Sequence, residues 1–140
     1  MGRHELARPL RGARRRARRT VETEEYFAML GRLLVRLGER IGEDPAALAL
    51  LPWLQQMQQD AVNLGYAQAR DAGYGPAYIT AVTGTSRQAV QQRITAGRQV
   101  RARIEAQAAA GGALVRIGDL RAEREARLAA AGVEDLREAR

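Results

Sequence analysis

The chain has 140 residues, enough for one domain or a small domain with appendages, and a formal net charge of +7. It has no cysteine and one histidine, His4, which excludes disulfides and cysteine-based metal sites and disfavours two-histidine metal sites and histidine-based triads. No apolar run approaches the roughly 20 residues of a membrane span, so we expect a cytoplasmic protein. We also expect no cofactor and no metal.

The positive charge is concentrated at the N-terminus. Every basic residue is arginine, and eight of them precede Val21, opposed only by Glu5. Pro9 and Gly12 interrupt this segment, so residues 1–19 are predicted to form a flexible, disordered arm. A terminal block of like charge is either a solvated tail or an interaction tail for a polyanion such as nucleic acid. We assign DNA contacts in the arm to Arg14, Arg15, Arg16, Arg18 and Arg19.

Residues 20–64 are predicted to be a helical packing and dimerisation region. After a cap at Thr20 or Thr23, apolar residues recur at steps of three and four along a helix that ends near Gly42. The resulting stripe either packs within the chain or forms a homodimer interface. We favour the interface and assign it to Phe27, Leu30, Leu34, Leu37 and Ile41.

Two prolines organise the next helices. Asp44-Pro45 marks a helix start and Pro52 a restart. The helix that follows is expected to place Trp53 in the core and to stop at Ala72-Gly73.

Residues 65–110 contain the segment that carries the functional prediction. A short helix is expected over 76–83, followed by a tight turn at Gly84, a residue suited to the left-handed conformation. Thr85 is predicted to cap a second helix that runs from residue 86 to about 110. Val90 and Ile94 should pack back onto two residues of the short helix, Ile79 and Val82.

This segment resembles the bacterial helix-turn-helix DNA-binding motif in its SRQA version. Short helix-turn-helix proteins of high-GC bacteria and region four of sigma factors are similar to it, and the Arg- and Ala-rich composition is typical of a GC-rich genome. The resemblance covers residues 67–94. It rests on Ala69-Arg70, Ala72-Gly73, Ile79, Gly84, Ser86-Arg87-Gln88-Ala89 and Gln92-Arg93.

The resemblance implies that the second helix enters the major groove of DNA. Arg87 can donate two hydrogen bonds to guanine, and Gln88 or Gln91 can pair with adenine. Ser86 and Thr85, at the helix start, suit a phosphate. Further DNA contacts are assigned to Gln92, Arg93, Thr95 and Arg98. The plainer alternative for residues 83–93 is a solvated helix in a helical bundle.

A charged helical segment is predicted over 113–140, with a helix at 117–139. The whole chain is therefore predicted to be all-α, with a helix-turn-helix domain, flanking helices and a disordered basic arm. We expect a homodimeric transcriptional regulator that binds double-stranded DNA and is not an enzyme. The alternatives are a DNA-organising protein for plasmid partition or phage packaging, and a sigma-like module that docks on RNA polymerase.

Overall fold

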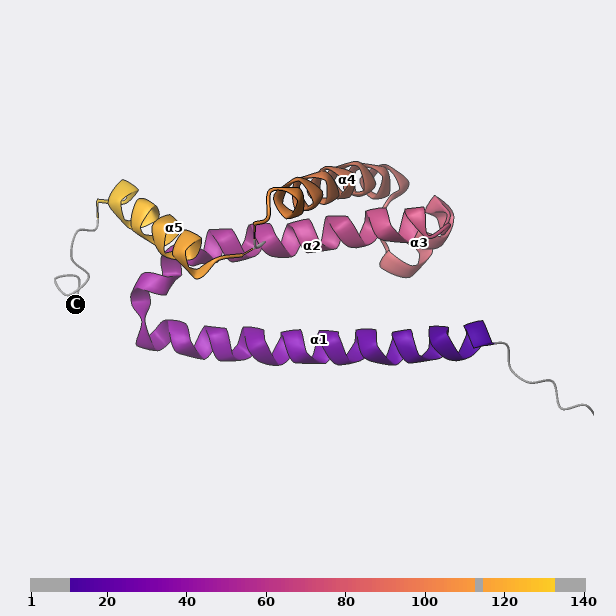
Figure 1. The fold of residues 1–140 in the computed structure, drawn as a ribbon, viewed down its shortest axis with the longest axis horizontal. Helices are drawn as coiled ribbons and strands as arrows, with labels where there is room; N and C mark the ends of the chain where they lie inside the picture. The colour runs from indigo at the N-terminus through magenta and orange to yellow at the C-terminus, as the bar shows by residue number, and fades with distance from the viewer. Residues whose placement is uncertain (1–10, 113–114, 133–140) are drawn as a thin grey trace, which may run out of the picture. The chain divides into compact units, whose positions relative to one another are not determined.

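The computed structural model describes residues 11–112 and 115–132, and within 11–21 it describes the backbone alone (Figure 1). Regular structure in these ranges is entirely helical, which confirms the all-α prediction. In chain order the elements are α1 (Arg11–Glu43), the 3₁₀ helix η1 (Pro45–Leu50), α2 (Leu51–Asp71), α3 (Pro76–Thr83), α4 (Arg87–Ala109) and α5 (Ile117–Ala130). The chain divides into two compact units, Met1–Pro45 and Ala46–Arg140.

The first unit contributes the long helix α1. Because α1 begins at Arg11, the prediction of an unstructured arm is wrong for residues 11–19; its first ten residues lie outside the described ranges. Arginine and alanine are strong helix formers. Gly12 falls in the first turn, where backbone N–H groups lack helical partners in any case. The helix ends at Glu43, and the Asp44 amide still donates to the Arg40 carbonyl at 3.1 Å.

The boundaries of α2 and α3 follow from proline and glycine, as the sequence predicts. Pro52 and Pro76 each lie in a first helical turn, where no helical hydrogen bond from their nitrogen is needed. After α2 ends at Asp71, Gly73 has φ 99°, and after α3 Gly84 has φ 68°. Both values lie in the left-handed region that glycine enters without a steric penalty.

Helices α2, α3 and α4 form the packed part of the second unit, with each of the three contacting the other two. Its centre is a cluster of Ile79, Val90 and Ile94, against which the half-buried Tyr66 and Ala69 pack. Val82 is 62% exposed, so the prediction that it joins this cluster is wrong.

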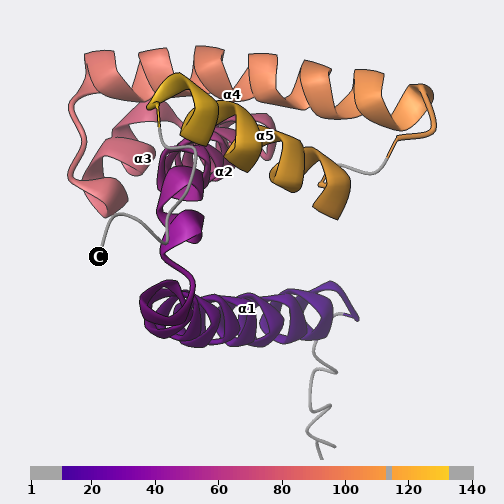
Figure 2. The ribbon, with the colours of Figure 1, turned by 90° about the vertical axis from the view of Figure 1, so that its left-hand side faces the viewer.

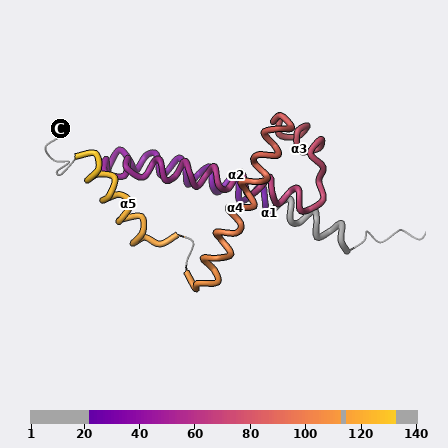
Figure 3. Tube along the Cα trace, turned by 90° about the horizontal axis from the view of Figure 1, so that it is seen from above, coloured from indigo at the N-terminus to yellow at the C-terminus, as the bar shows by residue number. Residues whose placement is uncertain are grey.

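Helix α4 crosses α2 at a steep angle (Figures 2 and 3). At the crossing, Gly97 is buried against the backbone of Asn63 and the side chain of Ala67. A Cβ built on Gly97 would overlap the Asn63 carbonyl oxygen and approach the Ala67 Cβ to 2.8 Å. The absence of a side chain at Gly97 therefore sets how closely the two helices approach.

Ion pairs flank the crossing on both sides. Asp60 on α2 pairs with Arg103 on α4 at 3.0 Å, and Asp71 pairs with Arg98 at 3.5 Å and also with Arg101. The Arg101 guanidinium, which donates a hydrogen bond to Asp71, lowers the pKa of that carboxyl below its usual value of 3.8. These contacts tie both ends of the contact region to α4.

Three further expectations differ from the structure. Trp53 is half-buried rather than a core residue, and it lines an open groove between α2 and α4. Helix α5 ends at Ala130 instead of 139, where Gly132 with φ 72° follows; the remainder of that prediction lies outside the described residues. The predicted division between residues 64 and 65 falls inside α2. Among the described helices, none is long and apolar enough to cross a membrane.

Candidate nucleic-acid interface

The turn between α3 and α4 is held by hydroxyl groups. The Ser86 hydroxyl oxygen accepts a hydrogen bond from the Ala89 amide at 3.2 Å, so Ser86 is the N-terminal cap of α4. The prediction that Thr85 is the cap is wrong. Its hydroxyl instead forms a 2.8 Å hydrogen bond with the hydroxyl of Tyr66 on α2, nineteen positions earlier in the chain.

Tyr66 connects α2 to both sides of the turn. Hydrogen bonds with the hydroxyls of Thr83 and Thr85 lower the pKa of the Tyr66 phenol; the Arg93 guanidinium acts in the same direction, and burial opposes them. That guanidinium lies over the Tyr66 ring, 5.5 Å from its centroid, and donates to the Asn63 side-chain oxygen at 3.4 Å. Tyr66 therefore fixes the position at which α4 begins.

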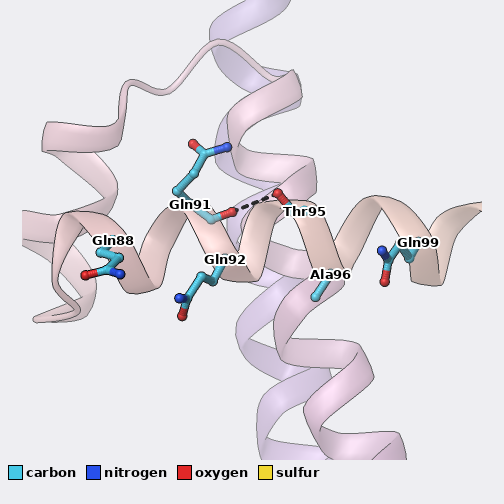
Figure 4. A pocket seen from close by; sticks show the side chains of 6 residues that line it. All are labelled: Gln88, Gln91, Gln92, Thr95, Ala96 and Gln99. Carbon is cyan, nitrogen blue, oxygen red and sulfur yellow. Dashed lines mark hydrogen bonds between the residues drawn. The ribbon is translucent and has the colours of Figure 1, made fainter.

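The face of α4 that is turned away from α2 is polar and open (Figure 4). A shallow surface hollow on it is lined by Gln88, Gln91, Gln92, Thr95, Ala96 and Gln99. Figure 4 shows these residues on the side of α4 turned away from α2, which passes behind it. Arg87, at the start of the same helix, is also exposed.

Two glutamines of α2 are engaged by neighbours on their own helix, whereas, among the described residues, the glutamines of this face are not. On α2, the Gln56 amide donates to Asp60 at 2.9 Å and the Gln59 amide donates to Asn63 at 3.0 Å. Within the described part of the chain, the side chains of Gln88, Gln91 and Gln92 form no such bond. The amide donors and acceptors of these three side chains are thus available to a ligand.

The structure separates the predicted DNA-binding residues of α4 into two groups. Arg87, Gln88, Gln91 and Gln92 are exposed on the N-terminal half of the helix, after Ser86. The other four make contacts within the chain. Thr95 donates to the Gln91 carbonyl at 3.1 Å, and Thr85, Arg93 and Arg98 contact α2 as described above.

The predicted sites in the first unit are placed as follows. Arg14, Arg15, Arg16, Arg18 and Arg19 lie in the first turns of α1, where the structure describes the backbone alone. The predicted dimerisation residues Phe27, Leu30, Leu34, Leu37 and Ile41 lie further along the same helix.

Sequence reasoning missed the roles of two residues at this site. In the sequence, Tyr66 looks like one more apolar position on α2. Its role depends on a hydrogen bond to Thr85, a residue far away in the chain, so a local pattern does not reveal it. Gly97 reads as a residue that weakens a helix interior, and that mismatch with the surrounding helix formers is the signal that could have identified it. Neither residue touches the open face of α4, yet both determine how that face is presented.

Comparison of the chain with protein-family models, with curated proteins and with solved structures found no match. In the described ranges, no three carboxylate or histidine side chains gather in a way that could hold a metal ion. The chemistry that the open face of α4 offers is hydrogen bonding by amides and one guanidinium.

Proposed function

We propose that this protein binds double-stranded DNA sequence-specifically, with the N-terminal half of α4 in the major groove. The observation that carries the proposal is the open face formed by Arg87, Gln88, Gln91 and Gln92. These side chains lie just beyond a capped turn and have hydrogen-bonding groups that the described chain leaves unused. A helix of this kind fits the major groove, and its first turns reach the base edges.

The side chains of this face suggest which bases are read. Glutamine pairs bidentately with adenine N6 and N7, and arginine pairs bidentately with guanine O6 and N7. The face has several glutamines and a single exposed arginine near its start, so the target should contain adenines adjacent to one guanine. The free amides at the beginning of α4, beside Ser86, suit a backbone phosphate that sets the register.

The function that best fits this chemistry is that of a homodimeric transcriptional regulator. One short recognition surface contacts only a few base pairs, and two copies would read two half-sites about 10 bp apart. The arginines that precede Val21 would add phosphate contacts beside each half-site, which strengthens binding without adding base specificity.

A selection from a random duplex library with the full-length chain tests the proposal. We expect an enriched motif with two half-sites, each combining adenines with a guanine. The Arg87→Ala variant should weaken binding to that motif by about 1–3 kcal/mol and relax the preference for the guanine. Arg121→Ala removes the same charge from an exposed position on α5 and should leave the base preference unchanged.

Two outcomes would refute the proposal. Salt-sensitive binding that enriches no sequence would mean that phosphate contacts alone hold DNA, and the open face of α4 would then have to meet a protein such as RNA polymerase. If Arg87→Ala and Arg121→Ala changed the base preference by the same amount, Arg87 would read no base. A footprint that extends over long arrays, instead of one or two half-sites, would replace the regulatory role by DNA organisation.

A further inference from the structure

Helix α1 exposes an apolar surface in the first unit. The predicted dimerisation residues, from here on the α1 stripe, alternate at steps of three and four, which places them at the a and d positions of a heptad repeat. Phe27 is 72% exposed and Leu30 is 50% exposed, while Leu34 and Ile41 are half-buried. Burying one such side chain stabilises a protein by roughly 1.5–3 kcal/mol, so the exposed stripe favours a partner.

Two glycines lie beside the stripe. Gly31 and Gly38 both occupy the heptad position that follows d, and a Cβ on either would meet no atom within 4 Å. Packing within the chain therefore does not require them, although each costs a helix interior about 1 kcal/mol relative to alanine. Residues without side chains next to an apolar stripe allow the backbone of a second helix to approach closely.

Charge along α1 is polarised. Six arginines lie between Arg11 and Arg19, three glutamates follow between Glu22 and Glu25, and the rest of the helix carries Arg32, Arg36 and Arg40 together with Glu39 and Glu43. Two parallel copies would bring glutamates beside glutamates and arginines beside arginines. Two antiparallel copies keep the arginine-rich first turns of the two helices at opposite ends of the pair, and they also oppose the two helix dipoles favourably.

We propose that α1 forms an antiparallel two-helix interface with α1 of a second copy of this chain. In such a pair a residues meet d residues of the partner, and the positions that flank the stripe meet their own counterparts. Phe27 then packs on the partner's Leu37 and Leu30 on the partner's Leu34. Gly31 faces itself across the two-fold axis, which explains why a side chain is absent there.

The size of this interface is sufficient for a specific dimer. The stripe extends over about 21 Å at 1.5 Å per residue. Pairing two such faces, including the neighbouring Tyr26 and Leu33, would bury on the order of 1,000 Å² in total, which reaches the lower range of specific protein interfaces. The inference specifies the homodimer of the proposed function but does not rest on DNA binding. Because the experiments contain no DNA, a failure of the α1 pairing can be told apart from a failure of DNA binding.

Sedimentation of the full-length chain tests the partner. The wild type should be a dimer, and Leu34→Glu should be a monomer because it puts a charge in the centre of the interface. Val35→Glu is the matched control: Val35 is the next residue, is 64% exposed and lies off the stripe, so this variant should remain a dimer. A monomeric wild type, or monomers from both variants, would overturn the proposal.

The direction of pairing can be tested because the chain contains no cysteine. Single variants Phe27→Cys and Leu37→Cys, each confirmed as dimers by sedimentation, are oxidised separately and after mixing. In the antiparallel pair residue 27 lies against the partner's residue 37, whereas two copies of residue 27 are about 15 Å apart along the axis, too far for a disulfide. Disulfide dimers should therefore form only in the mixture. Dimers in the separate samples, or none in the mixture, would overturn the antiparallel arrangement.

Discussion

Replacing Gly97 by alanine should destabilise the second unit, although alanine is the better helix former. The added Cβ would overlap the Asn63 carbonyl oxygen, which belongs to the backbone of α2 and cannot turn aside as a side chain would. The two helices must therefore move apart at their crossing, close to the buried Ala67 and Val100.

The expected size of this effect follows from two opposing contributions. Overpacking a well-packed contact costs about 1–3 kcal/mol and occasionally more, and an overlap with backbone belongs at the upper end of that range. Alanine returns about 1 kcal/mol through helix propensity. We expect a net loss of about 2 kcal/mol in the free energy of unfolding, which lowers the Tm of a unit of this size by about 10 °C.

A matched control comes from Gly65, an exposed glycine of α2 whose Cβ would meet no atom within 4 Å. Gly65→Ala should stabilise the unit by about 0.5–1 kcal/mol, so the two substitutions should act in opposite directions. Urea unfolding followed by the fluorescence of Trp53, the single tryptophan, measures both. A Gly97→Ala protein as stable as the wild type would refute the idea that backbone contact sets the helix spacing.

Three further predictions concern individual polar and charged side chains. Tyr66→Phe keeps the ring under Arg93 but removes the hydrogen bond to Thr85, so unfolding by urea should show a loss of about 0.5–1.5 kcal/mol; an unchanged midpoint would show that water replaces the bond without cost. Asp71 has a lowered pKa in the folded chain, so its contribution to stability is present above pH 3.8 and disappears as the pH falls through the folded-state value. Asp71→Asn should therefore flatten the pH dependence of Tm in that acidic range, and equal slopes in both proteins would contradict this. Changing the five arginines assigned to the arm to glutamine should weaken duplex binding almost equally for all sequences and reduce the salt slope by roughly 0.9 for each phosphate that is no longer neutralised, whereas an unaltered slope would exclude DNA binding by the arm.

The sequence predicts the helices of the second unit well because their boundaries depend on local chemistry. Pro52, Pro76 and Gly84 act within one turn of their own positions, and the structure places helix ends beside each of them. The same holds for Val90 and Ile94, whose spacing on one helix face suffices to predict their burial.

The errors arise where a distant residue decides between local alternatives. Thr85 and Ser86 are both good caps, and the choice depends on Tyr66, which engages Thr85 and leaves Ser86 to cap α4. Similarly, Arg93 and Arg98 look like outward arginines along α4, but residues on α2 pair with them. A pattern in one helix does not reveal which of its polar residues a neighbouring helix will engage.

The core of the second unit is small, and this has a consequence for how the chain tolerates substitution. The buried apolar residues of the described ranges are only Ala67, Ile79, Val90, Ile94 and Val100. Because large destabilisations come mainly from buried positions and strained contacts, folding constrains few sites beyond these and Gly97. Most other positions can change at little cost to stability, so sequences that preserve this fold could diverge widely while these few residues stay nearly unchanged.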